Sequence, residues 1–235
     1  MIIRKLKRNQ PILPKVVDIL RNLIIESELN PGERLNETLI ASKLGISRSP
    51  VREAIKVLES EDLVQTFSRR GTFVKDLTMK EVENLYMVLS LINRPTIRIA
   101  AKEMNARKRK ELETLMKKMR KNSEGNDIGK RAFLARRFHR FIFEATENDL
   151  LLKIHDFLGI QQERFRCYAL KAGTDVASAA NSEHLAIGKS LLDRDPDKAE
   201  SMIKEHFDKA YSRVLAVIQK EAKDSDSIGH SGETA

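Results

Sequence analysis

The spacing of apolar residues predicts helices at the start of the chain. Over residues 13–29, apolar positions recur at the three- and four-residue spacing of an amphipathic helix. The turn-forming residues 30–32 (Asn-Pro-Gly) then end that helix. Asn36 can cap a second helix that runs to Leu44. Gly45 follows directly, and glycine supplies the positive φ that a sharp turn between two helices often needs.

A third helix is predicted to begin at a Ser47 cap. Pro50 fits its first turn, because the amide groups there have no helical partner in any case. The inward face of this helix is formed by Val51, Ile55 and Leu58. The second and third helices, joined at Gly45, therefore read as a helix-turn-helix.

The spacing of the apolar residues changes after the third predicted helix. Residues 63–67 and 72–74 are short runs of β-prone side chains, separated by the basic turn 68–71 (Ser-Arg-Arg-Gly). This pattern predicts a β-hairpin with a basic tip, in other words a wing. A winged helix-turn-helix domain is thus expected over residues 1–76.

Every segment from Thr78 to about Lys220 has helical periodicity, and no strand-like alternation interrupts it. Thr78 and Glu81 form a capping box, and Asp195-Pro196 combines a cap with proline at the first helical position. The breaks predict six helices; they fall at residues 105–106, 125–126, 148–149, 173–174 and 193–196. We expect an all-helical antiparallel bundle over residues 77–222 and a disordered polar tail over 223–235. The fold class is mostly α.

Composition limits the alternatives. The chain has 235 residues and a formal net charge of +9, which suits a polyanionic partner. Only +4 of that charge lies in residues 1–76, so the motif rather than the charge predicts DNA binding. The single cysteine, Cys167, excludes an internal disulfide framework and is interpreted as an ordinary thiol. The chain has no signal-peptide pattern and no apolar run of membrane-spanning length, so we expect a cytoplasmic protein without a membrane partner.

The helix-turn-helix resembles that of the GntR family of bacterial transcription regulators. The matching residues are 29–37, 39–41, 44–54, 58–64 and 69–74, in that order along the chain. The helical remainder resembles the FadR-type effector domain, often called FCD. Its matching residues are fewer: Phe138-His139, Glu144-Ala145, Asn148, Glu183-His184 and His206.

The resemblance implies which residues meet DNA. In this family the arginine of the Pro-Gly-Glu-Arg turn, the first turns of the recognition helix and the wing tip contact the duplex. Carried over, these are Arg34, Ser47, Arg48, Ser49, Pro50, Arg52, Arg70 and Gly71. Chemistry agrees with the transfer, because an arginine fork matches O6 and N7 of guanine, and serine hydroxyls suit phosphate oxygens. The alternative for Arg48 and Arg52 is a solvated side chain or an ion pair with Glu53 or Glu59.

The resemblance also implies a metal site. FCD-type domains often hold a divalent metal with three histidines and an aspartate four residues before the first of them. The three histidines are His139, His184 and His206, but Ala135 stands at the aspartate position. Three imidazoles can still bind zinc or nickel and leave a position open for an effector. The alternative is a pocket that binds its effector without metal.

The expected effector pocket departs from the family at a second place. The family often has an arginine and a glutamate four residues apart on the first effector helix, where this chain has Leu89 and Asn93. We therefore expect an effector pocket formed by Asn93 and the three histidines. Either the ligand is less charged or larger than in relatives, or Arg94 or Arg98 supplies the charge from a neighbouring turn.

The predicted function is sequence-specific regulation of transcription, as a repressor rather than an enzyme. A homodimer would read a pseudo-palindromic operator in double-stranded DNA, because a two-fold protein matches a two-fold site. A small metabolite, by resemblance an organic acid, would modulate operator affinity. Two other classes remain open: a hydrolase that uses a three-histidine metal centre, and a binder indifferent to sequence. The hydrolase lacks a general base paired with the histidines.

Overall fold

The computed structural model describes residues 11–122, 128–171 and 176–229. Contacts divide the chain into two compact units, the first formed by the residues up to Thr78 together with Ile160–Tyr168, and the second by the rest. The first unit is thus larger than the predicted domain 1–76, because a segment from late in the chain joins it. Two of the expected helix breaks, at 125–126 and 173–174, lie outside the described residues.

The first unit contains the three predicted helices: α1 (Ile12–Ile25), α2 (Glu37–Leu44) and α3 (Arg48–Ser60). Asn36 caps α2 as predicted, since its side chain accepts hydrogen bonds from the amides of Thr38 and Leu39. Helix α1 ends four residues before the predicted end at residue 29, and Ser27 beyond it has a positive φ of 50°. The apolar spacing extends to Leu29 because this side chain is also buried in the core, although it lies beyond the end of the helix.

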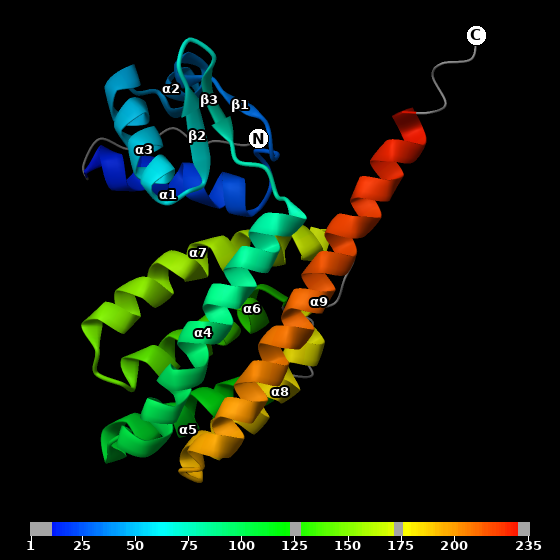
Figure 1. The fold of residues 1–235 in the computed structure, drawn as a ribbon. Helices are drawn as coiled ribbons and strands as arrows, with labels where there is room; N and C mark the ends of the chain where they lie inside the picture. The colour runs from blue at the N-terminus through cyan, green and yellow to red at the C-terminus, as the bar shows by residue number, and fades with distance from the viewer. Residues whose placement is uncertain (1–10, 123–127, 172–175, 230–235) are drawn as a thin grey trace. The chain divides into compact units, whose positions relative to one another are not determined.

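The predicted hairpin is present as β2 (Val64–Phe67) and β3 (Gly71–Val74). A third strand, β1 (Arg34–Leu35), pairs antiparallel with β3, so the strand order is β1-β3-β2. Strand β1 has no signal in the sequence, because two residues are too few to show an alternating pattern. The pairing joins the segment before α2 to the wing (Figure 1).

One hydrophobic core holds this unit together. Side chains from all three helices and from the strands are buried in it, including Val16, Leu20, Leu44, Leu58 and Leu63, none of which is exposed to solvent. Those on the helices are the inward positions of the helical periodicity. The core fixes α3 against α1 and α2 and leaves its opening turn outside.

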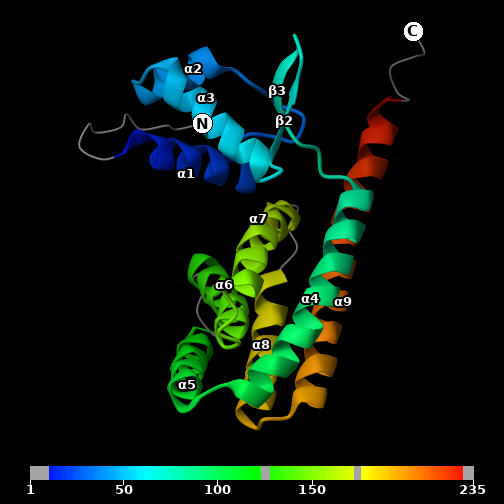
Figure 2. The same ribbon diagram turned by 60° about the vertical axis from the view of Figure 1, so that its left-hand side comes forward.

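The second unit is the predicted antiparallel helical bundle, so the mostly α fold class is confirmed. Six helices follow Thr78 in the described part of the chain: α4 (Met79–Glu103), α5 (Ala106–Lys121), α6 (Ile128–Glu144), α7 (Asp149–Lys171), α8 (Val176–Leu192) and α9 (Pro196–Gly229). Helices α4 and α9 lie side by side and run in opposite directions (Figures 1 and 2). Aromatic side chains fill the middle of the bundle; Phe138, Phe141 and Phe143 are almost fully buried.

The end of the chain differs from the prediction. Polar composition predicts a disordered tail from residue 223, yet α9 continues to Gly229. A helix that tertiary packing has already nucleated gains one hydrogen bond for each further residue, so poor local propensity does not end it at once. The start of α9 agrees with the prediction, because Asp195 accepts a hydrogen bond from the amide of Lys198 and Pro196 is the first helical residue. None of the described helices combines the length and the apolar run that a membrane crossing needs.

Candidate nucleic-acid interface and metal centre

The turn between α2 and α3 is built on Gly45. Its φ of 68° lies in the left-handed region, and its amide bonds back to the carbonyls of Ala41 and Ser42. A side chain there would strain the turn. The turn thus sets the start of α3 at a sharp angle to α2, and the first residues of α3 project from the unit. Ser47, Arg48, Ser49 and Arg52 are exposed, and Pro50 is half-buried.

Arg48 and Arg52 share one face of α3, as their four-residue spacing predicts. The Nη2 atom of each arginine donates a hydrogen bond to Oε2 of Glu37, at 3.3 Å for Arg48 and 3.1 Å for Arg52. The hydrogen bond from Arg52, with that from Arg48, lowers the pKa of Glu37. Ion pairs this exposed are worth about 0.2–1 kcal/mol each, so the arginines can leave Glu37 for a stronger partner.

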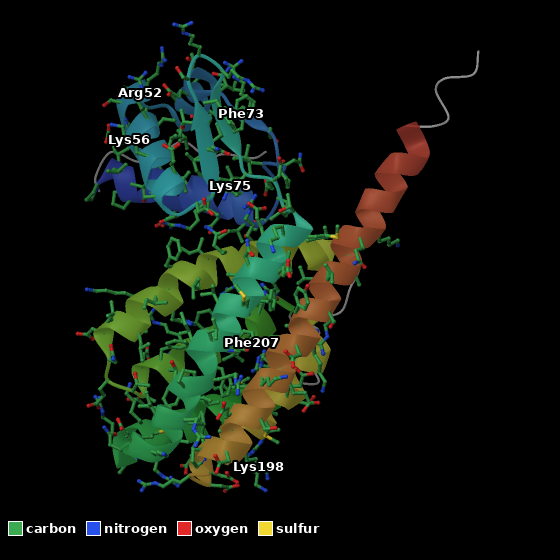
Figure 3. All side chains as sticks on the ribbon, in the orientation of Figure 1. Arg52, Lys56, Phe73, Lys75, Lys198 and Phe207 are labelled. Atoms are coloured by element: carbon green, nitrogen blue, oxygen red, sulfur yellow. The ribbon has the colours of Figure 1, made fainter. Side chains whose placement is uncertain are left out.

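The predicted partners of these arginines are occupied elsewhere. Glu53 pairs with Lys56 at 2.9 Å, and Glu59 accepts a hydrogen bond from the amide of Thr66 at 2.9 Å. Arg52 and Lys56 both lie on α3 (Figure 3), and their four-residue spacing puts them on one face of the helix. Ser47 occupies the N-cap position but makes no capping hydrogen bond, so the first amides of α3 lack a side-chain partner there. Helix amides of this kind bind phosphate oxygens.

The wing brings Arg34, Arg70 and Gly71 together. Gly71 has a φ of +99°, and a Cβ atom at that position would lie 3.1 Å from Nε of Arg34. The Arg34 side chain therefore passes directly over the glycine. Arg70 lies with its guanidinium carbon 5.4 Å from the centroid of the Phe67 ring, a cation–π contact at the wing tip. Both arginines are exposed, so this surface presents cations from β1 and from the hairpin.

The three predicted histidines meet inside the second unit. They come from three helices: His139 from α6, His184 from α8 and His206 from α9. Nε2 of His184 lies 3.0 Å from Nε2 of His139 and 3.3 Å from Nε2 of His206. Ligand atoms of all three lie within 4.8 Å of one another. Phe207 packs beside the cluster, with its ring centroid 5.7 Å from that of His139 (Figure 3).

A carboxylate orients one of these rings. Nδ1 of His206 donates a hydrogen bond to Oε2 of Glu183 at 2.7 Å, and the other oxygen of Glu183 accepts from Arg213 at 3.0 Å. Burial would raise the pKa of Glu183, but the bonds from His206 and Arg213 lower it overall. Burial, with the charges of neighbouring groups, lowers the pKa of both His139 and His184. Neutral imidazoles keep the lone pairs that metal binding requires.

The donor atoms fit a tetrahedral metal. Zinc–nitrogen bonds of about 2.0–2.1 Å place two ligand nitrogens about 3.3–3.4 Å apart in a tetrahedral site. Two of the nitrogen separations in the cluster, 3.0 Å between His139 and His184 and 3.3 Å between His184 and His206, are close to that spacing. Nδ1 of His139 and Nδ1 of His184 are buried without a partner, so only His206 has its outer nitrogen satisfied. The cluster can supply three nitrogen ligands, and Ala135 adds none.

A hollow of about 250 Å³ between α8 and α9 reaches this cluster. His206 and Glu183 line it together with Ser182, Ile187 and Lys209. The cavity thus has an apolar wall, a hydroxyl, the Lys209 cation and the carboxylates of Glu183 and Glu205 beside an imidazole, and a hollow of this kind can hold a small polar ligand.

Leu89 and Asn93, which stand where the family often has an arginine and a glutamate, do not form a charged site for an anionic ligand. Leu89 and Asn93 are buried on α4, and the Asn93 amide donates to the carbonyl of Leu89 at 2.9 Å. Arg94 and Arg98 do not substitute for the missing charge, because both pair with Glu200 on α9, each at 2.7 Å. Their charge stabilises the packing of α4 against α9. Among the predicted effector residues, the described contacts bring together the histidines but not Asn93.

Two family models match the chain. The model described as "Bacterial regulatory proteins, gntR family" covers residues 14–74, and the model of the FCD domain covers residues 84–209, more than half of the chain. The chain belongs to the GntR family and carries an FCD domain. It is therefore a DNA-binding transcription regulator with a ligand-binding effector domain, and not an enzyme.

Curated relatives of this GntR-family protein are similar over nearly their whole length. They include the uncharacterized HTH-type transcriptional regulator YdhC of Bacillus subtilis, 25% identical over 92% of this chain and 96% of the relative. The Nta operon transcriptional regulator of Aminobacter aminovorans is 26% identical over 84% and 91%. The solved structure of E. coli McbR/YncC has the same fold, with a TM-score of 0.73 over 90% of this chain and 99% of that one, at 17% identity.

Two residues that contact the candidate site residues, Glu37 and Glu183, were named in the sequence only within matching segments and were given no role there. Glu37 lies at the first position of α2, where a carboxylate is ordinarily explained by the helix dipole. Glu183 directly precedes His184, but adjacent residues on a helix point in different directions. Its hydrogen bond is to His206 on another helix, and no pattern in the sequence indicates that contact. His155 on α7 is half-buried and stacks on Phe143, with 4.5 Å between the ring centroids.

Proposed function

We propose that this GntR-family protein is a repressor that binds a pseudo-palindromic operator as a homodimer and is modulated by a small organic acid. The observation that carries the proposal is the pair Arg48 and Arg52, held on one exposed face at the start of the recognition helix. A two-residue arginine face can read guanine edges in the major groove. The operator is chromosomal, so we place the protein in the cytoplasm.

The DNA contacts divide into two classes. Arg48 and Arg52 read bases, because they are long enough to leave Glu37 and enter the groove. Ser47, Ser49 and Pro50 belong to the helix start, whose amides suit phosphate oxygens. Arg34, Arg70 and Gly71 form the wing surface and contact the backbone or the minor groove. This assignment follows from exposure and charge.

An apolar surface on α4 supports the dimer. Met87 and Leu91, one turn apart, are 58% and 65% exposed. Apolar side chains clustered on one helix face favour burial against a partner, and we propose that a second copy of the chain covers them.

The histidine cluster is proposed as a metal-assisted effector site. His139, His184 and His206 would hold a divalent ion such as zinc or nickel, with Glu183 orienting His206. A bound ion would offer an open coordination position to the carboxylate of an organic acid. The effector changes operator affinity only if it binds one dimer arrangement better, with a coupling of about 1–3 kcal/mol. The metal-free alternative keeps the same pocket and uses the imidazoles as hydrogen-bond partners.

Selection of binding sites from genomic DNA tests the regulator. We expect enriched sequences with two-fold symmetry that outcompete a random duplex at physiological salt. Equal competition by the random duplex would refute sequence-specific reading. Metal analysis of protein purified without chelator tests the cluster, with an expected content of up to one ion per chain. A thermal-shift screen of organic acids then identifies the effector, because a ligand that binds the folded state raises its melting temperature.

A further inference from the structure

Helix α5 carries a concentration of positive charge that DNA recognition by the first unit does not explain. Over Ala106–Lys121 the helix has eight lysines and arginines against two glutamates. Its buried face is apolar and consists of Leu112, Leu115, Met116 and Met119. The lysines and arginines therefore occupy the remaining faces of α5, and some of them line a cavity.

That cavity is a groove between α5 and α6 with a volume of about 380 Å³. Four cations line it, Arg107, Lys110 and Lys118 from α5 and Arg137 from α6, against one carboxylate, Glu111. Its floor is apolar, formed by the nearly buried side chains of Leu115 and Phe141. The volume lies in the range of about 300–1,000 Å³ that small-molecule sites occupy.

The positive charge in this groove is only partly compensated within the protein. Arg137 pairs with Glu144 at 2.7 Å, and Glu111 has Lys108 at 3.3 Å. Arg107, Lys110 and Lys118 form no ion pair with the carboxylates of the described residues. Like charges gathered in one hollow repel each other and focus a positive potential there, which a bound anion relieves.

The groove is separate from the histidine cluster. Arg137 and Phe141 lie two residues before and two after His139 on α6. Residues two apart on a helix point to nearly opposite sides. Accordingly His139 faces α8 and α9, where His184 and His206 are, whereas Arg137 and Phe141 face α5.

We propose that this groove is a second binding site, for a phosphorylated metabolite with at least two anionic groups. Three unpaired cations favour a multiply charged ligand over a single carboxylate, because each exposed pair alone contributes little. The small apolar floor accommodates a short carbon skeleton. A concave site of this size suits a small molecule better than duplex DNA, whose phosphates follow a convex surface.

Titration calorimetry of the full chain with inorganic phosphate, pyrophosphate and tripolyphosphate tests the proposal at physiological salt. We expect affinity to increase with the number of charges. The double variant Lys110→Gln/Lys118→Gln should weaken tripolyphosphate binding about tenfold, the equivalent of two exposed ion pairs. The matched control is Lys117→Gln/Lys121→Gln, which removes the same charge from exposed positions of α5 outside the groove. It should change affinity less than twofold.

Three results would overturn the proposal. Equal weakening by both double variants would mean a diffuse charge effect without a site. Absence of polyphosphate binding to the wild type would remove the ligand class. If instead the groove variant weakened binding of operator DNA and polyphosphate did not bind, the groove would be a contact for nucleic acid. Melting temperatures measured in parallel show that both variants are folded, since glutamine and lysine have similar helix propensities.

Discussion

Oε2 of Glu183 lies 2.7 Å from Nδ1 of His206, and this pair fixes which nitrogen of the ring carries the proton. A carboxylate can only accept, so Nδ1 donates and the lone pair of Nε2 is directed at the other two histidines. Arg213, 3.0 Å from the second carboxylate oxygen, holds Glu183 in place. The geometry is that of a carboxylate–histidine pair that supports a metal ligand.

Glu183→Gln should therefore weaken zinc affinity about 10–100-fold, the usual effect of losing such a partner. Chelator competition measures it. The control is Glu83→Gln, which removes an exposed carboxylate of α4 paired with Lys80 at 2.9 Å and should leave affinity unchanged. A wild type that binds no zinc would refute the metal proposal itself, whereas equal affinities of wild type and Glu183→Gln would refute only the orienting role.

Arg48→Ala and Arg52→Ala test base reading. Each should cost about 1–3 kcal/mol of operator binding and relax discrimination at one base pair, while binding to random DNA changes less. Competition binding at matched salt separates the two effects. Lys80→Ala, an exposed cation on α4 that pairs with Glu83, is the charge control. If both arginine variants kept wild-type operator affinity, neither side chain would belong to the interface.

Gly71→Ala tests the wing. Alanine strains a backbone whose φ is +99°, and its Cβ would displace the Arg34 side chain, whose Nε would be 3.1 Å away. We expect a stability loss of about 1–3 kcal/mol in urea unfolding and weaker operator binding. Gly159→Ala is the control, because nothing lies within 4 Å of the added atom. Operator affinity equal to wild type would mean that DNA binding does not depend on this arrangement of Arg34 and Gly71.

Stability should fall in mild acid because of His155. Burial lowers the pKa of His155 to about 4, against the opposing effect of Asp156. Above the unfolded pKa of about 6.5 the ring is neutral in both states, so it has no effect. Below it only the unfolded state takes up the proton, and stability falls by up to about 1.4 kcal/mol per pH unit until the folded pKa is reached.

Urea unfolding at pH 7 and pH 5 checks this pH dependence. His155→Gln should reduce the loss between the two pH values by about 2 kcal/mol. His230→Gln, in which the histidine lies near the end of the chain, is the control and should leave the loss unchanged. An identical acid loss in wild type and His155→Gln would assign the effect to other groups.

Local patterns predicted more of the fold than of the site chemistry. The Asn36 cap, the Gly45 turn and the six bundle helices follow from propensities that act within a few residues. Strand β1 has only two residues and forms only because β3 is beside it. The same limit applies to chemistry: three histidines could be chosen by resemblance, but the bond from His206 to Glu183 spans 23 residues and depends on how α8 and α9 pack.

A substitution at Ala135 tests the metal site by adding a ligand, whereas Glu183→Gln removes the partner of one. It lies one turn before His139 on α6, so its Cβ is on the same face as the imidazole. An aspartate there would bring a carboxylate oxygen toward the three nitrogens and complete a four-ligand site. Ala135→Asp should therefore raise zinc affinity, measured by chelator competition, and lower the effect of an added carboxylate effector, which loses the open position. Ala135→Asn, similar in size but uncharged, should gain much less. Unchanged zinc affinity in Ala135→Asp would mean that the cluster does not present its ligands toward this position.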